Sequence, residues 1–458
     1  MINSTIAFFN FNKKVNIAPL VVFRILFGAL LIYSTSRFML KGWVYDMYIQ
    51  PSFFFGYYGF EWVKPLAGKW MYLPFITLLI GALGIMIGAF YRLSSILAFL
   101  SFSYIELLDK TNYLNHYYFI SLMCFLFILV PANRSFSMDV KWKIVPPLNQ
   151  VFYWHIGVFK FQLAVVYIFA GIAKLHSDWL FEAQPLMIWL QAHRDMPLIG
   201  SLLKEKWIAY IFSWFGCAYD LLIVFFLINN KTRRSAYLAV VIFHLITWFL
   251  LPIGVFPWVM ILSTTIFFSV SFHEKILSWL KRIVCYRVEE KAKEIKKSVL
   301  VRVSSIIVVL FIVIQLAVPF RFAFYPGNLF WNEEGFRFSW RVMLMHKEGL
   351  ANFYIIDKQT KRTIEIDNKK YLTEIQIDQM STQPDMLLQY AQHLNEIFKD
   401  TIINAGSQSF HIVDPKVSAE VFVSLNGRSS QLYVSKKHDL SKIPYNLAHR
   451  NWLEPYKE

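Results

Sequence analysis

The chain has 458 residues, of which 56% are hydrophobic and 18% aromatic, and its formal net charge is +16. This composition is too apolar for a soluble domain and indicates a polytopic membrane protein. The basic residues gather in short loops between apolar runs, as topology signals do, so the charge does not indicate a nucleic-acid partner. The three cysteines have no CxxC spacing, which argues against a disulfide framework and a thiolate metal site.

Nine apolar runs approach the length of a bilayer span. They cover residues 20–40, 73–91, 93–108, 116–131, 152–173, 207–228, 235–251, 256–272 and 299–318. Several are shorter than the ~20 residues that a straight span needs, and the pair around Pro252 could form a re-entrant hairpin. With the N-terminus in the cytoplasm, nearly every basic cluster lies on the cytoplasmic side, as the positive-inside rule requires.

This orientation places residues 109–116, residues 174–206 and everything after Val318 on the extracytoplasmic side. After Val318 the hydrophobic runs shorten, and charged and turn residues appear. The patterns predict strands at 353–356 and 363–366, a helix at 385–399, and a hairpin of strands at 417–425 and 430–434. We therefore expect a transmembrane helical bundle of about nine spans over residues 1–318 and an extracytoplasmic β-rich or α+β domain over residues 319–458.

Lys174 ends the fifth apolar run and is followed by Leu, His, Ser, Asp and Trp. It could be an anchor, with its stem in lipid and its ammonium among the headgroups. It could also be a desolvated amine with a lowered pKa that acts as a base. Position alone favours the anchor, because most lysines at span ends only anchor.

Three further places concentrate polar or aromatic groups. The connection 109–116 is crowded with hydrogen-bonding residues, which suit either an interfacial cap or a site. His244 lies inside an apolar run, as a site residue or as a buried neutral histidine bonded to another helix. The segment 330–343 mixes aromatics with Arg337 and Arg341, as in an interfacial belt or in a groove for an acidic peptide or a planar ligand.

The sequence lacks HExxH, GxSxG and Walker A motifs, and it lacks a GxGxxG motif after a strand. Metal hydrolysis, serine hydrolysis and nucleotide chemistry are therefore disfavoured. What remains is a metal-free site of Lys, His, Asp, Asn and aromatic residues that opens from the bilayer. Such a site suits a membrane-dissolved reactant and proton transfer.

Short motifs follow one another in a recognisable order. They are Gly81–Gly88 with Tyr91-Arg92, Leu108–Thr111 with Asn115-His116, Ala132-Asn133 with Asp139, Ala170-Gly171 with Lys174-Leu175 and Asp178-Trp179, Phe243-His244, Gly335-Phe336 with Ser339-Trp340 and Met343, and Gln389–Ala391. In these motifs the chain resembles the vitamin K-dependent gamma-glutamyl carboxylases and their prokaryotic relatives, the HTTM-domain proteins. It departs from the family pattern at Ala173, His176 and Arg341.

The resemblance implies that vitamin K hydroquinone, or menaquinol, is deprotonated and oxygenated by O2 to the epoxide. The strong base formed on the way removes a γ-proton from a glutamate of a protein or peptide, and the carbanion adds CO2. Lys174 matches the base that deprotonates the hydroquinone, and His116 matches another active-site residue. The expected quinol-binding residues are Asn115, Asp109, His244 and Tyr167, and the expected substrate-binding residues are Trp340, Ser339, Phe336 and Arg341.

With this resemblance, the base becomes the favoured interpretation of Lys174. The expected protein is an integral membrane enzyme that needs a lipid-soluble quinone and no metal. Two alternatives remain. One is a quinol epoxidase without carboxylation. The other is a non-catalytic transporter or lipid-binding protein, which would have a water-filled path through the bundle in place of a closed pocket beside Lys174.

Overall fold

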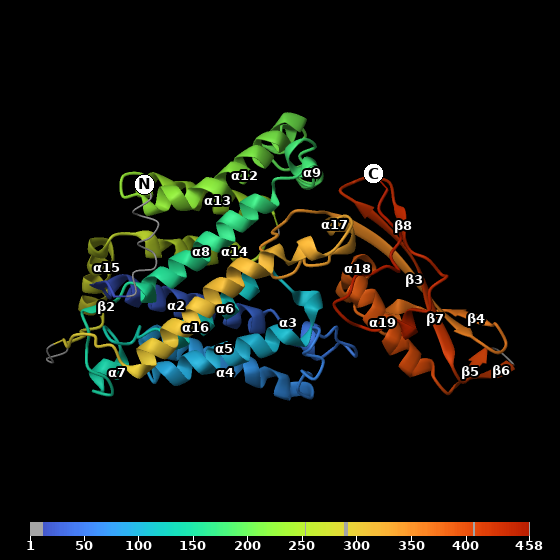
Figure 1. The fold of residues 1–458 in the computed structure, drawn as a ribbon, viewed down its shortest axis with the longest axis horizontal. Helices are drawn as coiled ribbons and strands as arrows, with labels where there is room; N and C mark the ends of the chain where they lie inside the picture. The colour runs from blue at the N-terminus through green and yellow to red at the C-terminus, as the bar shows by residue number, and fades with distance from the viewer. Residues whose placement is uncertain (1–11, 252, 288–291, 406–407, 458) are drawn as a thin grey trace.

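The computed structural model describes residues 12–251, 253–287, 292–405 and 408–457. The chain forms a bundle of long helices, with a mixed domain of strands and helices at one end of the bundle (Figure 1). Each of the nine apolar runs forms a helix, as the sequence predicts. These helices are α2 (Ala18–Leu40), α4 (Tyr72–Ile87), α5 (Tyr91–Leu108), α6 (Asn115–Leu129), α8 (Trp154–Ala173), α12 (Lys206–Ile228), α13 (Arg233–Leu250), α14 (Phe256–Thr264) and α16 (Val299–Ala317).

In the described chain, seven helices are long and apolar enough to cross a membrane, and α6 is shorter, with 15 residues. The segment from α14 to Phe267 qualifies only together with α15 (Val270–Ile283), and the two are bent by 112°, as in a broken span or a re-entrant loop. Lys281 and Arg282 in the last turn of α15 favour an interfacial position for this helix. Pro252, around which the sequence suggested a hairpin, lies outside the described residues.

Short elements connect the long helices. Toward the C-terminal domain lie α3 (Trp43–Tyr48) and α9 (Ser177–Leu180), whereas β2 (Gln150–Phe152) and α7 (Met138–Lys141) lie at the opposite end (Figure 1). Strand β2 pairs antiparallel with β1 (Lys14–Asn16). The remaining connections contain the 3-10 helices η2 (Gly68–Met71), η3 (Lys110–Asn112) and η4 (Thr265–Phe267) and the helices α10 (Leu186–Gln191) and α11 (Gly200–Leu203).

Small residues allow the long helices to pack closely. A Cβ added at Gly81 of α4 would lie 2.9 Å from the backbone nitrogen of Ala98 on α5. A Cβ at Gly171 of α8 would lie 2.8 Å from the backbone nitrogen of Leu221 on α12. Close backbone approach of this kind is the usual way in which membrane helices associate, because lipid provides little hydrophobic drive between them. The second contact positions the site described below.

The C-terminal domain is built on an antiparallel sheet of order β4-β3-β7-β8. The sheet is covered by helices α18 (Glu374–Thr382) and α19 (Pro384–Phe398), and buried side chains such as Phe353, Tyr390 and Val421 form the core between them. Both predicted strand pairs and the predicted helix are confirmed. The strands are β3 (Lys347–Asp357), β4 (Thr363–Glu365), β5 (Thr401–Ala405), β6 (Gln408–Ile412), β7 (Pro415–Leu425) and β8 (Gln431–Val434), of which β5 and β6 form a separate hairpin.

The link between the two parts is irregular. The last long helix, α16, continues into the 3-10 helix η5 (Val318–Phe324), which is followed by the short helix α17 (Leu329–Asn332). Residues 333–346 then run to β3 without regular structure apart from turns. Two further 3-10 helices, η6 (Asn368–Lys370) and η7 (Leu440–Lys442), pack beside the sheet and its helices.

Candidate active site

Lys174 lies at the C-terminal end of α8 and points between α8 and α12. Its Nζ donates to the Asp220 carboxylate of α12 at 2.7 Å and to the Ala170 carbonyl at 3.3 Å. Lys174 and Asp220 are each only 6% exposed. The close packing of Gly171 against Leu221, the neighbour of Asp220, brings the two charges together. Lys174 is therefore fixed inside the protein and does not extend freely from the end of the helix.

The carboxylate partner changes the expected chemistry of this lysine. The Asp220 carboxylate, 2.7 Å from Lys174 Nζ, is a buried counter-ion for this amine. The two side chains therefore form one buried ion pair. The acid–base unit is thus Lys174 together with Asp220. Asp220 is the one acidic residue of the sixth apolar run. A single acidic residue inside an apolar run indicates a site residue, and Asp220 was not among the predicted ones.

An apolar cavity of about 100 Å³ adjoins this pair, and we refer to it as the apolar cavity. Side chains of α8, α10, α12 and α13 line it, including those of Tyr167 and His244. The Tyr167 hydroxyl and His244 Nε2 are 3.2 Å apart. His244 Nδ1 is buried, and no group of the described chain is bonded to it. The cavity therefore combines apolar walls with a small number of polar groups, one of which lacks a partner.

A larger cavity of about 520 Å³, the polar cavity, lies between the bundle and the C-terminal domain. Side chains of α2, of η3 and of the start of α6 line it together with six residues of the segment before β3: Glu333, Phe336, Arg337, Val342, Met343 and Met345. His116 and Asn115 are part of this lining. Asn115 accepts from the Tyr113 hydroxyl at 3.1 Å and donates to the Arg341 carbonyl at 2.9 Å, which ties the helix to the C-terminal domain.

The two cavities share one wall, made of Ile253, Phe256, Val342 and Met343. The Phe256 ring lies between the two histidines, with its centroid 5.8 Å from that of His116 and 5.7 Å from that of His244. Side chains on either side of this wall are therefore within a few ångströms of the other cavity.

The polar cavity carries an excess of positive charge. Asp385 of α19 lies 2.7 Å from Lys110 Nζ and 2.7 Å from Arg337 Nη1, so one carboxylate serves two cations. Burial would raise the pKa of the Asp385 carboxyl, but Arg337 and Lys110 hold it well below its usual range. Burial lowers the pKa of the Lys110 ammonium to about 8, although Asp385 opposes this change. Glu333, the acidic residue in the lining of the polar cavity among the described residues, is already paired with Lys347 at 2.8 Å.

Some residues predicted for the site lie outside both cavities. Asp109 is 2% exposed and accepts from Thr111 and from Gln376 of α18, so it joins the connection to the C-terminal domain. Ser339 donates to carbonyls of its own turn. Trp340 is 1% exposed and stacks on Tyr118.

The remaining predicted residues divide between the cavities and the core. Lys174, Tyr167 and His244 line the apolar cavity, and His116, Asn115 and Phe336 line the polar one. The Arg341 guanidinium lies over the Phe322 ring, 4.4 Å from its centroid, and is absent from both linings. Arg337 occupies the place in the polar cavity that the sequence analysis had given to Arg341.

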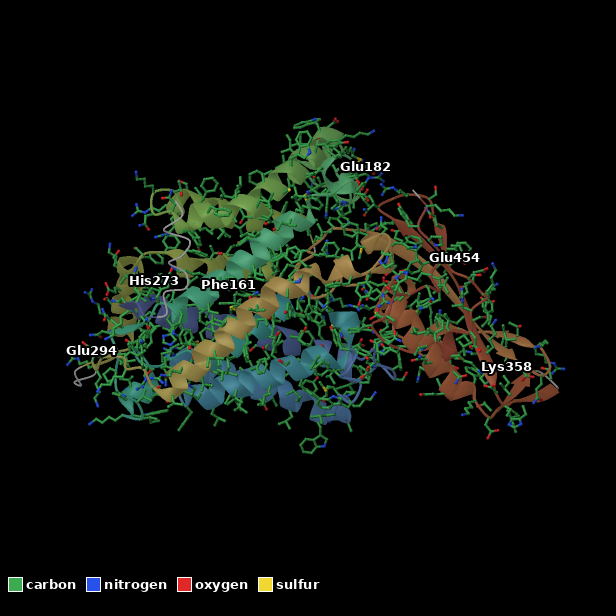
Figure 2. All side chains as sticks on the ribbon, viewed as in Figure 1. Phe161, Glu182, His273, Glu294, Lys358 and Glu454 are labelled. Atoms are coloured by element: carbon green, nitrogen blue, oxygen red, sulfur yellow. The ribbon has the colours of Figure 1, made fainter. Side chains whose placement is uncertain are left out.

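The segment after Lys174 is also held by the C-terminal domain. Asp178 forms a bidentate ion pair with Arg428 at 2.8 and 2.7 Å and accepts from Asn426 at 2.6 Å. Glu182, at the top of the molecule in Figure 2, adds a second carboxylate to Arg428 at 2.9 Å. Burial would raise the pKa of Asp178, but the bonds from Arg428 and Asn426 outweigh it and lower this pKa.

The fold and this geometry define a class: multi-pass membrane proteins with a C-terminal domain that closes cavities at one end of the helical bundle. Residues 12–272 match the model of the HTTM domain, and residues 301–458 match that of the vitamin K-dependent gamma-carboxylase lumenal domain. The chain belongs to the vitamin K-dependent gamma-carboxylase family, and the match to a lumenal domain assigns its C-terminal domain to the extracytoplasmic side. No solved structure matches the chain significantly.

Proposed function

We propose that the protein couples oxygenation of a vitamin K-type hydroquinone to the addition of CO2 to the γ-carbon of a protein glutamate. The observation that carries this proposal is the pair of adjoining cavities. One is apolar and contains a buried acid–base pair, which suits a lipid-soluble quinol. The other is polar and cationic, which suits an acidic side chain from the aqueous side. We further propose that the N-terminus is cytoplasmic, which the basic clusters of the loops support.

The residues of the apolar cavity fit a hydroquinone. Its walls suit an aromatic ring, and His244 Nδ1 offers an unused hydrogen-bonding position for a hydroxyl group. When bound, the hydroquinone supplies the reducing power and, through its reaction with O2, the strong base that the γ-proton requires. No residue of the cavity could replace that base, because an ordinary side chain is far too weak to deprotonate the γ-carbon of glutamate.

The Lys174–Asp220 pair has a defined role in this proposal. The Asp220 carboxylate, held by Lys174 Nζ, would accept the proton of a hydroxyl group bound beside the pair. The Lys174 ammonium then balances the negative charge left on the donor oxygen. The total charge of the buried site does not change during this transfer, which avoids the cost of creating a net charge in a low dielectric.

In the polar cavity, Lys110 and Arg337 share one carboxylate, so an incoming glutamate side chain completes the charge balance. His116 lines the polar cavity beside Phe256 of the shared wall, with no hydrogen bond to its ring nitrogens in the described chain. It can therefore contact the glutamyl group or the incoming CO2. Phe256 separates the reactants and limits the access of water to the apolar side.

The test measures two products from purified protein in lipid: quinol epoxide and labelled CO2 in a glutamyl peptide. Wild type should form both. Lys174→Ala and Asp220→Asn should each lose about 10²–10⁴-fold in both products, as expected for loss of a proton-transfer group. Lys206→Ala is the matched control, because this exposed lysine is the first residue of α12 and is not part of the lining of the apolar cavity.

The outcomes separate the alternatives. Epoxide without labelled peptide would support the quinol epoxidase. Absence of both products from wild type, with Lys174→Ala no different, would overturn the proposal and leave the non-catalytic alternatives. Equal losses in Lys174→Ala and Lys206→Ala would show that the pair has no special role.

A further inference from the structure

A third cavity, of about 730 Å³, lies at the end of the bundle away from the C-terminal domain, and we refer to it as the distal cavity. It is enclosed by the starts of α5 and α8, the segment after α6, and the residues that precede α16. Figure 2 labels Glu294 at this end, far from Lys358 and Glu454 of the C-terminal domain. The distal cavity shares no lining residue with the polar or the apolar cavity.

The distal cavity is strongly cationic. Arg92, Arg134, Lys293 and Lys296 line it. Glu294 is the one acidic residue in its lining, and this carboxylate is already paired with Lys14 at 2.8 Å. Among the described residues, no other carboxylate of the lining offsets the four basic groups, which leaves room for an anionic ligand.

Two of the lining groups have unused hydrogen-bonding capacity. Arg92 forms no side-chain hydrogen bond or ion pair within the described ranges, although Arg134 donates to the Pro146 carbonyl at 3.1 Å. His155 is 1% exposed, and its ring lies close to the backbone of Phe152. Within the described chain, His155 Nδ1 has no hydrogen-bond partner. A buried polar atom without a partner is costly, and a bound ligand would satisfy it.

One side of the distal cavity is apolar and continues onto an exposed helix face. Leu300 and Val301, in the first turn of α16, belong to its lining. Leu300 is 59% exposed, and Val303, about one helical turn further along α16, is 47% exposed. This outer face of α16 continues from the cavity along the membrane-spanning part of the helix. A ligand that uses both features has an anionic head and an apolar chain.

We propose that the distal cavity binds the phosphate headgroup of an anionic phospholipid, whose acyl chain lies along α16. The phosphate would accept from Arg92 and from the lysines that precede α16, and the positive end of the α16 dipole adds to the attraction. The lipid would join residues 293–298 to the bundle. The site is independent of the proposed carboxylation and does not require it.

The test uses the full chain in neutral detergent micelles and measures the binding of a fluorescent phosphatidylglycerol by anisotropy. A basic group near a membrane surface contributes about fivefold to such binding. Arg92→Gln/Lys293→Gln should therefore weaken it about 25-fold. The matched control is Lys275→Gln/Lys281→Gln, which removes the same charge from α15 without touching the cavity lining. Lys293→Gln/Lys296→Gln, at two exposed positions, covers the possibility that the Arg92 variant folds poorly.

Three results would overturn the proposal. Equal weakening by the control pair would show attraction to the surface as a whole. Absence of binding by wild type would exclude the site directly. A thermal midpoint raised as much by inorganic phosphate as by phosphatidylglycerol would show a site for soluble anions. Failure of the carboxylation assay has no bearing on these measurements, because the readouts are binding and thermal stability.

Discussion

Substitution of Asp385 tests how strongly ion pairs stabilise the junction between the bundle and the C-terminal domain. Its carboxylate lies 2.7 Å from both Lys110 and Arg337, and the side chains of Asp385 and Lys110 are 10% and 1% exposed. Asp385→Asn keeps the shape of the side chain and removes the charge. Lys110 and Arg337, both buried, then lose the carboxylate that pairs with them.

The expected cost follows from this geometry. Removing one partner of a buried ion pair costs about 3–5 kcal/mol, because the other charge stays buried and uncompensated. A domain of this size loses about 2–4 °C in thermal midpoint per kcal/mol, so the C-terminal domain should unfold about 10 °C lower. Hydrogen exchange in η3 and α19, the two elements that the carboxylate joins, should become more than about tenfold faster.

The assay is thermal unfolding of the purified protein in lipid, followed by hydrogen exchange read by mass spectrometry. Asp378→Asn is the matched control, because this exposed α18 carboxylate forms no hydrogen bond or ion pair in the described structure. It should change stability by no more than about 0.5 kcal/mol. A midpoint for Asp385→Asn within about 2 °C of that of the control would refute the conclusion that Asp385 neutralises the cluster.

Three further predictions concern the site. The affinity for a glutamyl peptide should fall as the pH rises through about 8, because the Lys110 ammonium loses its charge there. Lys110→Arg should remove this pH dependence of the affinity. If the variant keeps the pH dependence of wild type, Lys110 does not have this role. Phe256→Ala should join the two cavities and raise epoxide formation relative to labelled peptide, because water gains access; an unchanged ratio would show that the ring is no barrier. The pKa of Asp178 is lowered, so its pairing with Arg428 contributes stability above the ordinary carboxyl pKa and loses it only as the pH falls through the lower value of the folded state. Limited proteolysis should therefore show the β7–β8 hairpin docked at pH 5 in wild type and released in Arg428→Gln, and equal protection of both would contradict the clamp.

The positions of the helices could be predicted because a long apolar run has few other ways to satisfy its backbone in a bilayer. The polar side chains were harder to interpret. Asp109, which looked like a site residue, joins two domains, whereas Asp220 was overlooked and pairs with Lys174. Their roles depend on how α8, α12 and α18 are rotated against one another, which local sequence does not specify.

The side-chain directions in the segment before β3, residues 333–346, could not be predicted from the sequence either. Its backbone adopts positive φ at Phe338, Trp340 and Met343, so its side chains follow neither a helical nor a strand period. Arg337 consequently enters the polar cavity, and Arg341 packs on Phe322. A sequence pattern that relies on regular periods could predict an arginine at this surface but not which of the two faces the cavity.

Val342 and Met343 determine when the shared wall between the two cavities is completed during protein synthesis. During synthesis the chain emerges from its N-terminus, so every membrane-spanning helix is made before these two residues. The partition between the cavities is thus completed only after the following domain has been translocated and has folded back onto the bundle. A newly made bundle would hold Lys174 and Asp220 beside an open cavity. The order of synthesis therefore keeps the site incomplete until the chain has reached its final arrangement.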